Sequence, residues 1–215
     1  MVSSKYVLIT RPNHDAVTDC LYFWTQQIVD IAGGKGFIVL DLSGKKANRS
    51  TFLSYLKKRD PVLVFFNGHG SDSVIAGYDN ETLIGDGNTV KLLFGKIIYA
   101  RSCDAAKVLG VESIKHGALA FIGYKEKYWL ATSEDKLTKP LQDSVAKLFL
   151  EPSNLVPSSL IKGNSAKEAY RKSQEAATRN ISYMLSTAAT DAEREAVPYL
   201  HSNRLNQVLL GDGSA

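Results

Sequence analysis

The chain has 215 residues, of which 44% are hydrophobic and 22% charged, and its 26 Lys and Arg outnumber its 22 Asp and Glu to give a net charge of +4. These values are typical of a water-soluble globular protein, and the length suits a single domain over residues 1–215. They disfavour nucleic-acid binding, because the basic residues are spread along the chain, and membrane insertion, because no apolar run approaches ~20 residues.

Strand-like apolar runs alternate with helical patterns through the first two thirds of the chain, and the last third is helical in pattern. The Gly-, Asp- and Asn-rich segment 71–95 is typical of a turn or a small hairpin. This alternation predicts an α/β fold, with a mostly parallel, doubly wound sheet flanked by helices and a helical C-terminal third. In chain order we expect a strand at 6–10, a helix at 15–32, a strand at 37–40, a helix at 48–59, strands at 62–66 and 96–100, a helix at 104–116, a strand at 118–123, helices at 137–150, 166–189 and 191–203, and a strand at 207–210.

Two chemically reactive residues follow two successive core strands of this pattern. His69 comes after the apolar run that begins at Pro61, between two glycines, and Cys103 comes after the run that begins at Lys96. Open α/β sheets bind their ligands at the carboxyl ends of parallel strands. If the two strands are neighbours, a thiol and an imidazole meet at that edge, which points to nucleophilic catalysis by cysteine.

The surrounding residues suit that chemistry. A helix expected to begin at Asp104 would place Cys103 at a helix N-terminus, which lowers a thiol pKa. His69 would donate a proton to the departing amine, and the backbone N–H groups of Gly70 and Cys103 would stabilise an oxyanion.

A structural explanation is also open at each residue. A lone cysteine at a strand end is most often a small buried hydrophobic side chain, and a His-Gly pair is often merely a turn. The joint occurrence at successive strand ends favours the functional interpretation. Cys20 shares a helical face with Trp24, so we expect it to be core packing.

The segments Phe65–Ser71 (FFNGHGS) and Ile97–Ala106 (IIYARSCDAA) resemble the two active-site segments of caspase-like cysteine peptidases. That superfamily includes gingipains, clostripain, legumain, metacaspases, separase and the CHAT proteins. The resemblance implies a caspase-like α/β sandwich, a His69–Cys103 dyad, an oxyanion hole from Gly70 and Cys103, and hydrolysis of peptide bonds without metal or organic cofactor.

The resemblance is closer to gingipain- or CHAT-like prokaryotic members than to true caspases. The caspase signature Gln-Ala-Cys-x-Gly is here Arg101-Ser102-Cys103-Asp104-Ala105, and the His-to-Cys spacing is shorter than the ~50 residues of caspases.

The residues around the dyad suggest two opposite specificities. Arg101 shares a strand face with Cys103 and Arg11 follows the first strand, so together they would favour Asp or Glu before the scissile bond, unless both lie on the surface or pair with Asp15, Asp72 or Asp104. Asp72 and Asp104 flank the dyad and would instead form an acidic pocket for Arg or Lys. In the superfamily the loop at 124–136 contacts substrate, so Tyr128 and Trp129 are candidate aromatic walls.

We therefore predict a cysteine endopeptidase acting on protein or peptide substrates, with room for an activating partner protein. The alternatives are a catalytically inactive caspase-like scaffold and a flavodoxin-like binding domain. The start lacks the apolar core of a signal peptide, and two cysteines make neither a disulfide framework nor a zinc site by spacing. We expect a cytoplasmic protein with no nucleic-acid or membrane partner.

Overall fold

The computed structural model describes residues 5–85 and 87–215, and its centre is a six-stranded sheet in the order β2-β1-β3-β6-β7-β8. The pairings from β2 through to β7 are parallel, whereas β8 runs antiparallel to β7. The prediction of a mostly parallel α/β sheet is therefore confirmed. The strands are β1 (Tyr6–Arg11), β2 (Ile38–Ser43), β3 (Leu63–Asn67), β6 (Ile97–Arg101), β7 (Ala120–Tyr124) and β8 (Gln207–Gly211).

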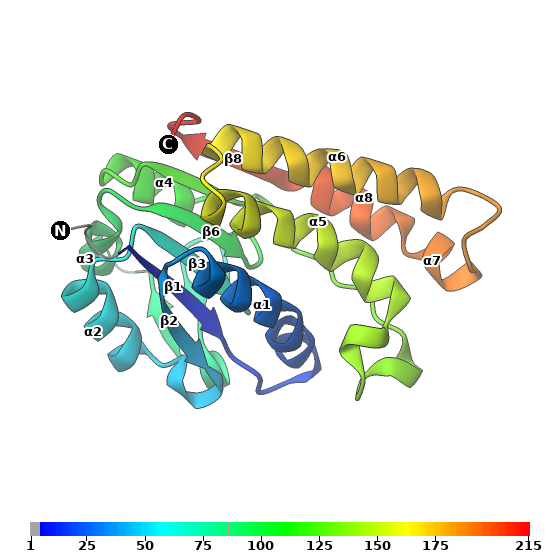
Figure 1. The fold of residues 1–215 in the computed structure, drawn as a ribbon, viewed down its shortest axis with the longest axis horizontal. Helices are drawn as coiled ribbons and strands as arrows, with labels where there is room; N and C mark the ends of the chain where they lie inside the picture. The colour runs from blue at the N-terminus through cyan, green and yellow to red at the C-terminus, as the bar shows by residue number, and fades with distance from the viewer. Residues whose placement is uncertain (1–4, 86) are drawn as a thin grey trace.

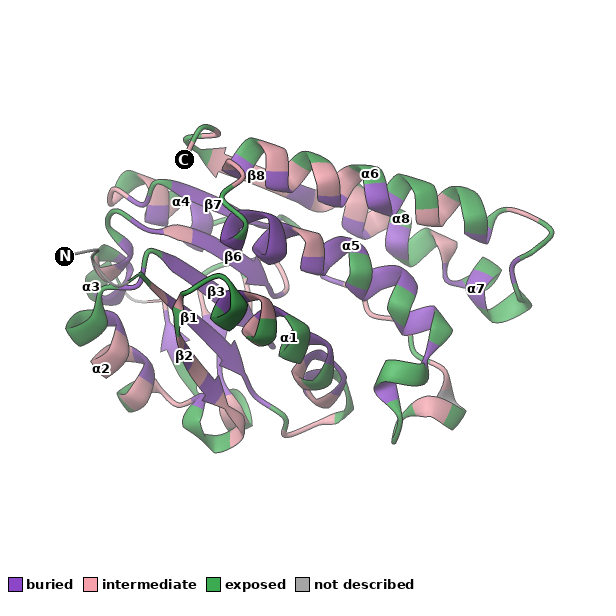
Figure 2. Ribbon diagram, viewed as in Figure 1, coloured by how far each residue is buried: buried purple, intermediate pink, exposed green. Residues whose placement is uncertain are grey.

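Helices cover both faces of this sheet, because successive apolar residues of each strand point to opposite sides (Figures 1 and 2). In β1, Leu8 packs into the cluster that contains residues of α2 (Arg49–Arg59), α3 (Gly87–Val90) and α4 (Leu109–Lys115). Val7 and Ile9 pack into the other cluster, with residues of α1 (Ala16–Gly34), α5 (Ser144–Ile161) and α6 (Ala166–Met184).

The segment between β3 and β6 contains the predicted hairpin. It consists of β4 (Ile75–Ala76) and β5 (Thr82–Ile84), which pair antiparallel. This hairpin begins directly after His69, because the amide of Ala76 donates to the backbone oxygen of His69 at 3.0 Å.

The C-terminal third is helical as predicted, but α5 extends beyond the predicted end at Leu150 and passes through Pro152 and Pro157. A proline inside a helix leaves the carbonyl four residues earlier without its amide donor. For Pro152 that carbonyl belongs to Leu148, and the side-chain amide of Asn180 on α6 donates to it at 2.8 Å. A tertiary contact thus replaces the missing helical hydrogen bond, which local sequence cannot show.

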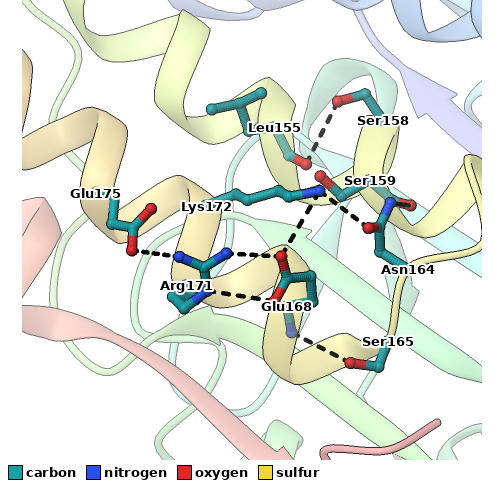
Figure 3. A network of polar contacts seen from close by, with 9 residues as sticks. All are labelled: Leu155, Ser158, Ser159, Asn164, Ser165, Glu168, Arg171, Lys172 and Glu175. Carbon is teal, nitrogen blue, oxygen red and sulfur yellow. Dashed lines mark hydrogen bonds and ion pairs between the residues drawn. The ribbon is translucent and has the colours of Figure 1, made fainter.

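The start of α6 is held by an exposed polar network (Figure 3). Ser165 caps the helix by accepting the amide of Glu168, and Arg171 pairs with Glu168 at 2.6 Å. Lys172 donates to Asn164 at 2.9 Å and so ties the helix to the turn before it. Beyond α6, α7 (Asp191–Glu195) and α8 (Val197–Asn206) return the chain to β8 (Figure 1). Within the described residues, every helix is too short or too polar to span a bilayer.

Candidate active site

The two predicted active-site segments lie side by side at one edge of the sheet. β3 and β6 are parallel neighbours with Asn67 opposite Arg101. His69 lies two residues after Asn67 and Cys103 two residues after Arg101, so both leave the sheet at the same level. The amide of Gly68 still donates to the backbone oxygen of Arg101 at 3.3 Å. A Cβ atom at Gly70 would lie 2.1 Å from Ser102 Oγ, which shows how closely the two segments approach.

The backbone around His69 turns sharply into the β4–β5 hairpin. Gly68 has φ +128°, a conformation that L side chains rarely adopt. Gly70 lies opposite Ile75 in an antiparallel pair. The flanking hydrogen bonds run from the amide of Ser71 to the backbone oxygen of Val74 and from the amide of Ala76 to the backbone oxygen of His69. The N–H of Gly70 therefore takes no part in the hairpin ladder, which leaves it suited to bind an oxyanion.

His69 is positioned by a carboxylate that sequence analysis did not assign to the site. Its Nε2 lies 2.6 Å from Asp15 Oδ2, while Asp15 Oδ1 accepts the amide of Thr18 at 2.8 Å and caps α1. Partial burial raises the pKa of Asp15, but the hydrogen bonds from Thr18 and His69 outweigh it and lower that pKa to about 2. The carboxylate is thus ionised at neutral pH and can only accept from Nε2–H of His69, so in a neutral ring the lone pair lies on Nδ1.

One signal for Asp15 was present in the sequence. The polar run Asn13-His14-Asp15 follows β1 after a single proline, and β1 pairs with β3, so this run reaches the same sheet edge as His69. His14, Asp15 and His69 each offer one ligand atom, and these atoms lie within 4.8 Å of one another. They are residues that could hold a metal ion.

Cys103 is half-buried just beyond β6, and its thiol donates to the backbone oxygen of Tyr128 at 3.8 Å. Burial raises the pKa of this thiol, and the nearby Asp104 acts in the same direction. The predicted helix start at Asp104 is wrong, because Asp104 has φ +57° and α4 begins only at Leu109. The predicted lowering of the thiol pKa by a helix N-terminus is therefore absent.

Arg101 shares a face with Cys103 as predicted, but its side chain is 0% exposed. The guanidinium carries five N–H groups, and each of the five donates to a side-chain oxygen. The acceptors are Asn67 (twice), Ser153, Asn154 and Thr25. No N–H remains for a substrate carboxylate, so the structure corrects the prediction that Arg101 lines a specificity pocket.

Arg11 is buried as well, at 3% exposure, and is paired with Asp41 on β2. Its remaining bonds go to the backbone oxygen of Tyr22 at 3.2 Å and to Gln26 at 2.9 Å. Both arginines therefore join the sheet to the covering helices, and neither presents its guanidinium group to a substrate carboxylate as was expected.

The two acidic residues predicted beside the site lie on the loops that carry His69 and Cys103. Asp72 is exposed, and its backbone oxygen accepts the amides of Val108 and Leu109 at 3.2 and 2.7 Å. These bonds fasten the loop after His69 to the loop after Cys103, which carries the half-exposed Asp104.

The aromatic residues after β7 have different places. Tyr128 is only 8% exposed and belongs to the core, so it is not a pocket wall. Trp129 is partly exposed and is held against α8, where its backbone N–H and C=O bond the side chain of Asn203 at 2.8 and 2.7 Å. Substrate contact by Trp129 stays a prediction.

No protein-family model matches the sequence, and no curated protein matches it. The fold is similar to that of several solved structures, among them the three that follow. They are the Arg specific cysteine proteinase gingipain R (RgpB), with TM-score 0.63 and 12% identity; RgpB of Porphyromonas gingivalis with its pro-domain, with TM-score 0.58 and 10% identity; and a structure described only as a protease, with TM-score 0.51 and 18% identity.

Each similarity covers 98% of this chain but only 46% or 47% of the neighbour, so the chain spans about half the length of these proteins. At these identities the similarity concerns the fold. The chain has the caspase-like α/β fold of the gingipain cysteine proteinases.

Proposed function

We propose that the chain is a cysteine endopeptidase in which Cys103 is the nucleophile and His69 the general acid and base. The observation that carries this proposal is the 2.6 Å contact between His69 and Asp15 at the sheet edge where the neighbouring strand delivers Cys103. A nucleophile, a base and a group that orients the base are the three parts of a covalent hydrolase site. The cysteine proteinase fold of the structural neighbours supports the same class of reaction.

The reaction follows from these parts. Nδ1 of His69 accepts the thiol proton, Sγ of Cys103 bonds the substrate carbonyl carbon, and the N–H of Gly70 supports the oxyanion. The C–N bond then breaks as His69 returns the proton to the departing amine. Water, deprotonated by His69, hydrolyses the thioester and restores the thiol.

The raised pKa of Cys103 means that the resting site holds a thiol. Proton transfer to His69 must therefore accompany attack, rather than precede it. The ionised Asp15 favours this transfer, because its negative charge stabilises the imidazolium that forms.

For specificity we propose cleavage after Arg or Lys. Both arginines are buried, whereas Asp72 is exposed and Asp104 half-exposed beside the dyad, so these two carboxylates can meet a substrate. They lie on two loops that hydrogen bonds fasten together, so they can act on one side chain. The gingipain neighbour is itself described as Arg specific.

The test is labelling by peptidyl acyloxymethyl ketones that carry Arg, Lys, Asp, Glu or Leu at the terminal position. We expect labelling by the Arg and Lys probes, loss of labelling in Cys103→Ala, and strong reduction in His69→Ala. Cys20→Ala is the matched control, since Cys20 is buried in α1 and burial raises its pKa to about 12. Preferential labelling by Asp or Glu probes would contradict the specificity proposal alone.

One observation favours a second candidate, a non-proteolytic scaffold of the same fold. Cys103 is half-buried and its thiol is bonded to Tyr128, as in a structural cysteine. Failure of every probe, with Cys103→Ala less stable than the unmodified protein, would support the scaffold over the peptidase.

A further inference from the structure

His14 is a largely buried side chain whose two ring nitrogens have no hydrogen-bond partner among the described residues. Its side chain is 10% exposed. Its ring packs edge-on against the rings of His69 and Tyr78, with centroids 5.8 and 5.4 Å apart. Buried polar groups are almost always satisfied, so an imidazole held in this way points to an additional ligand.

The geometry around His14 suits a metal ion. Asp15 Oδ2 lies 3.5 Å from Nε2 of His14 and 2.6 Å from Nε2 of His69. In a tetrahedral zinc site with bonds of ~2.1 Å, neighbouring ligand atoms are about 3.4 Å apart. The first distance already has this value. The second requires His69 to withdraw by less than ~1 Å when a metal ion replaces the proton it shares with Asp15.

The site is also accessible and chemically appropriate. The side chains of His69 and Asp15 are 39% and 38% exposed, so an ion can enter from solvent. Two imidazoles and one carboxylate form a nitrogen and oxygen donor set that suits Zn²⁺ and leaves a coordination position for water.

We propose that His14, Asp15 and His69 bind a divalent transition-metal ion, with Zn²⁺ as the preferred ion, and that its binding inhibits the enzyme. The inhibition, unlike the binding, rests on the proposed peptidase function. A metal ion on Nε2 of His69 places the ring proton on Nδ1, which removes the lone pair that must accept the Cys103 proton. The ion also neutralises Asp15, whose charge stabilises the imidazolium.

Binding is tested by calorimetric titration of the full chain with Zn²⁺, in unmodified protein and in Cys103→Ala. We expect one ion per chain with closely similar affinity in both proteins, because the proposed ligands do not include the thiol. His14→Phe keeps an aromatic ring in the packed position without a ligand atom, and we expect it to weaken binding at least tenfold. His201→Ala, on the exposed side of α8, is the matched control and should bind as the unmodified protein does.

Two results would overturn the proposal. Loss of binding in Cys103→Ala would place the ion on the thiol and His69. Unchanged binding in a folded His14→Phe protein, shown by circular dichroism and a cooperative melt, would exclude His14. Neither outcome depends on peptidase activity, so the metal site and the proposed function fail independently.

The effect on activity has its own readout. With a cleavable peptide, we expect Zn²⁺ to inhibit the unmodified protein and a chelator to restore its rate. The Zn²⁺ concentration for half inhibition should rise at least tenfold in His14→Phe, each protein being compared with its own rate without metal. Equal inhibition of both proteins would refute the regulatory part.

Discussion

The buried Arg101 provides a decisive test, because a structural arginine and a substrate-binding arginine respond oppositely to Arg101→Met. Methionine keeps the length and much of the volume of the side chain but has no N–H donors. If Arg101 is structural, the substitution destabilises the fold and leaves the preference for the substrate residue unchanged. If it binds substrate, stability hardly changes and specificity does.

The cost can be worked out from the partners of the guanidinium. Thr25 also donates to the backbone oxygen of Leu21, and Ser153 to that of Leu150, so their hydroxyls keep a partner. The side-chain oxygens of Asn67 and Asn154 depend mainly on Arg101. A buried polar group left unsatisfied costs about 1–3 kcal/mol, so two of them give a loss of about 4 kcal/mol.

The assay is equilibrium unfolding in urea, together with thermal melting. For a chain of this size about 4 kcal/mol corresponds to a fall in Tm of roughly 8–16 °C. Arg59→Met is the control, because Arg59 is exposed at the end of α2 and surface substitutions stay within about 0.5 kcal/mol. A stable Arg101→Met protein with altered probe preference would refute the structural role and restore the pocket predicted from the sequence.

Three further predictions concern the dyad. Asp15→Asn keeps the cap of α1, because Asn caps as well as Asp, yet we expect peptidase activity to fall about 100-fold. The variant should also lose about 1 kcal/mol of folding stability after solvent screening, because the lowered pKa of Asp15 stabilises the folded state. This contribution is fully present above the ordinary pKa of 3.8 and vanishes as the pH falls to about 2, and urea unfolding at several pH values measures it. Gly70→Ala places Cβ against Ser102 and should cost about 1–3 kcal/mol and most of the labelling, whereas Gly33→Ala, with open space around Cβ, should do neither. Alkylation of Cys103 by iodoacetamide, with Cys20→Ala as background, should reach half its maximal rate at a higher pH than free cysteine measured in parallel, and a lower midpoint would contradict the effect of burial on the thiol pKa.

Strand position was the part of the site that sequence could predict. Short apolar runs mark buried parallel strands, and residues just after such strands must emerge at one edge of the sheet. This placed the segments of His69 and Cys103 together, as the pairing of β3 with β6 confirms. Alternation also placed Arg101 on the face of Cys103.

The sequence pattern did not predict which charged residues are buried or which residues make long-range contacts. A charged residue at a strand end is usually exposed, and only the tertiary structure shows that Asn67, Asn154 and their neighbours enclose Arg101. Likewise, Asp15 precedes His69 by 54 positions, so no spacing rule connects them. The prediction of a helix directly after Cys103 was wrong for a local reason. Asp104 takes a left-handed conformation that its residue type permits but does not require.

The charges of the site bear on how the proposed peptidase activity depends on pH. Asp15 keeps its negative charge down to about pH 2, so it does not titrate in the range where a peptidase works. The raised pKa of Cys103 keeps the resting nucleophile protonated at neutral pH. Neither the Asp15 carboxylate nor the Cys103 thiol therefore changes charge between about pH 2 and neutral pH. Under the peptidase proposal, Asp15→Asn should therefore lower the rate of peptide cleavage because the base loses the charged group that orients it, whereas the scaffold alternative predicts no cleavage at any pH.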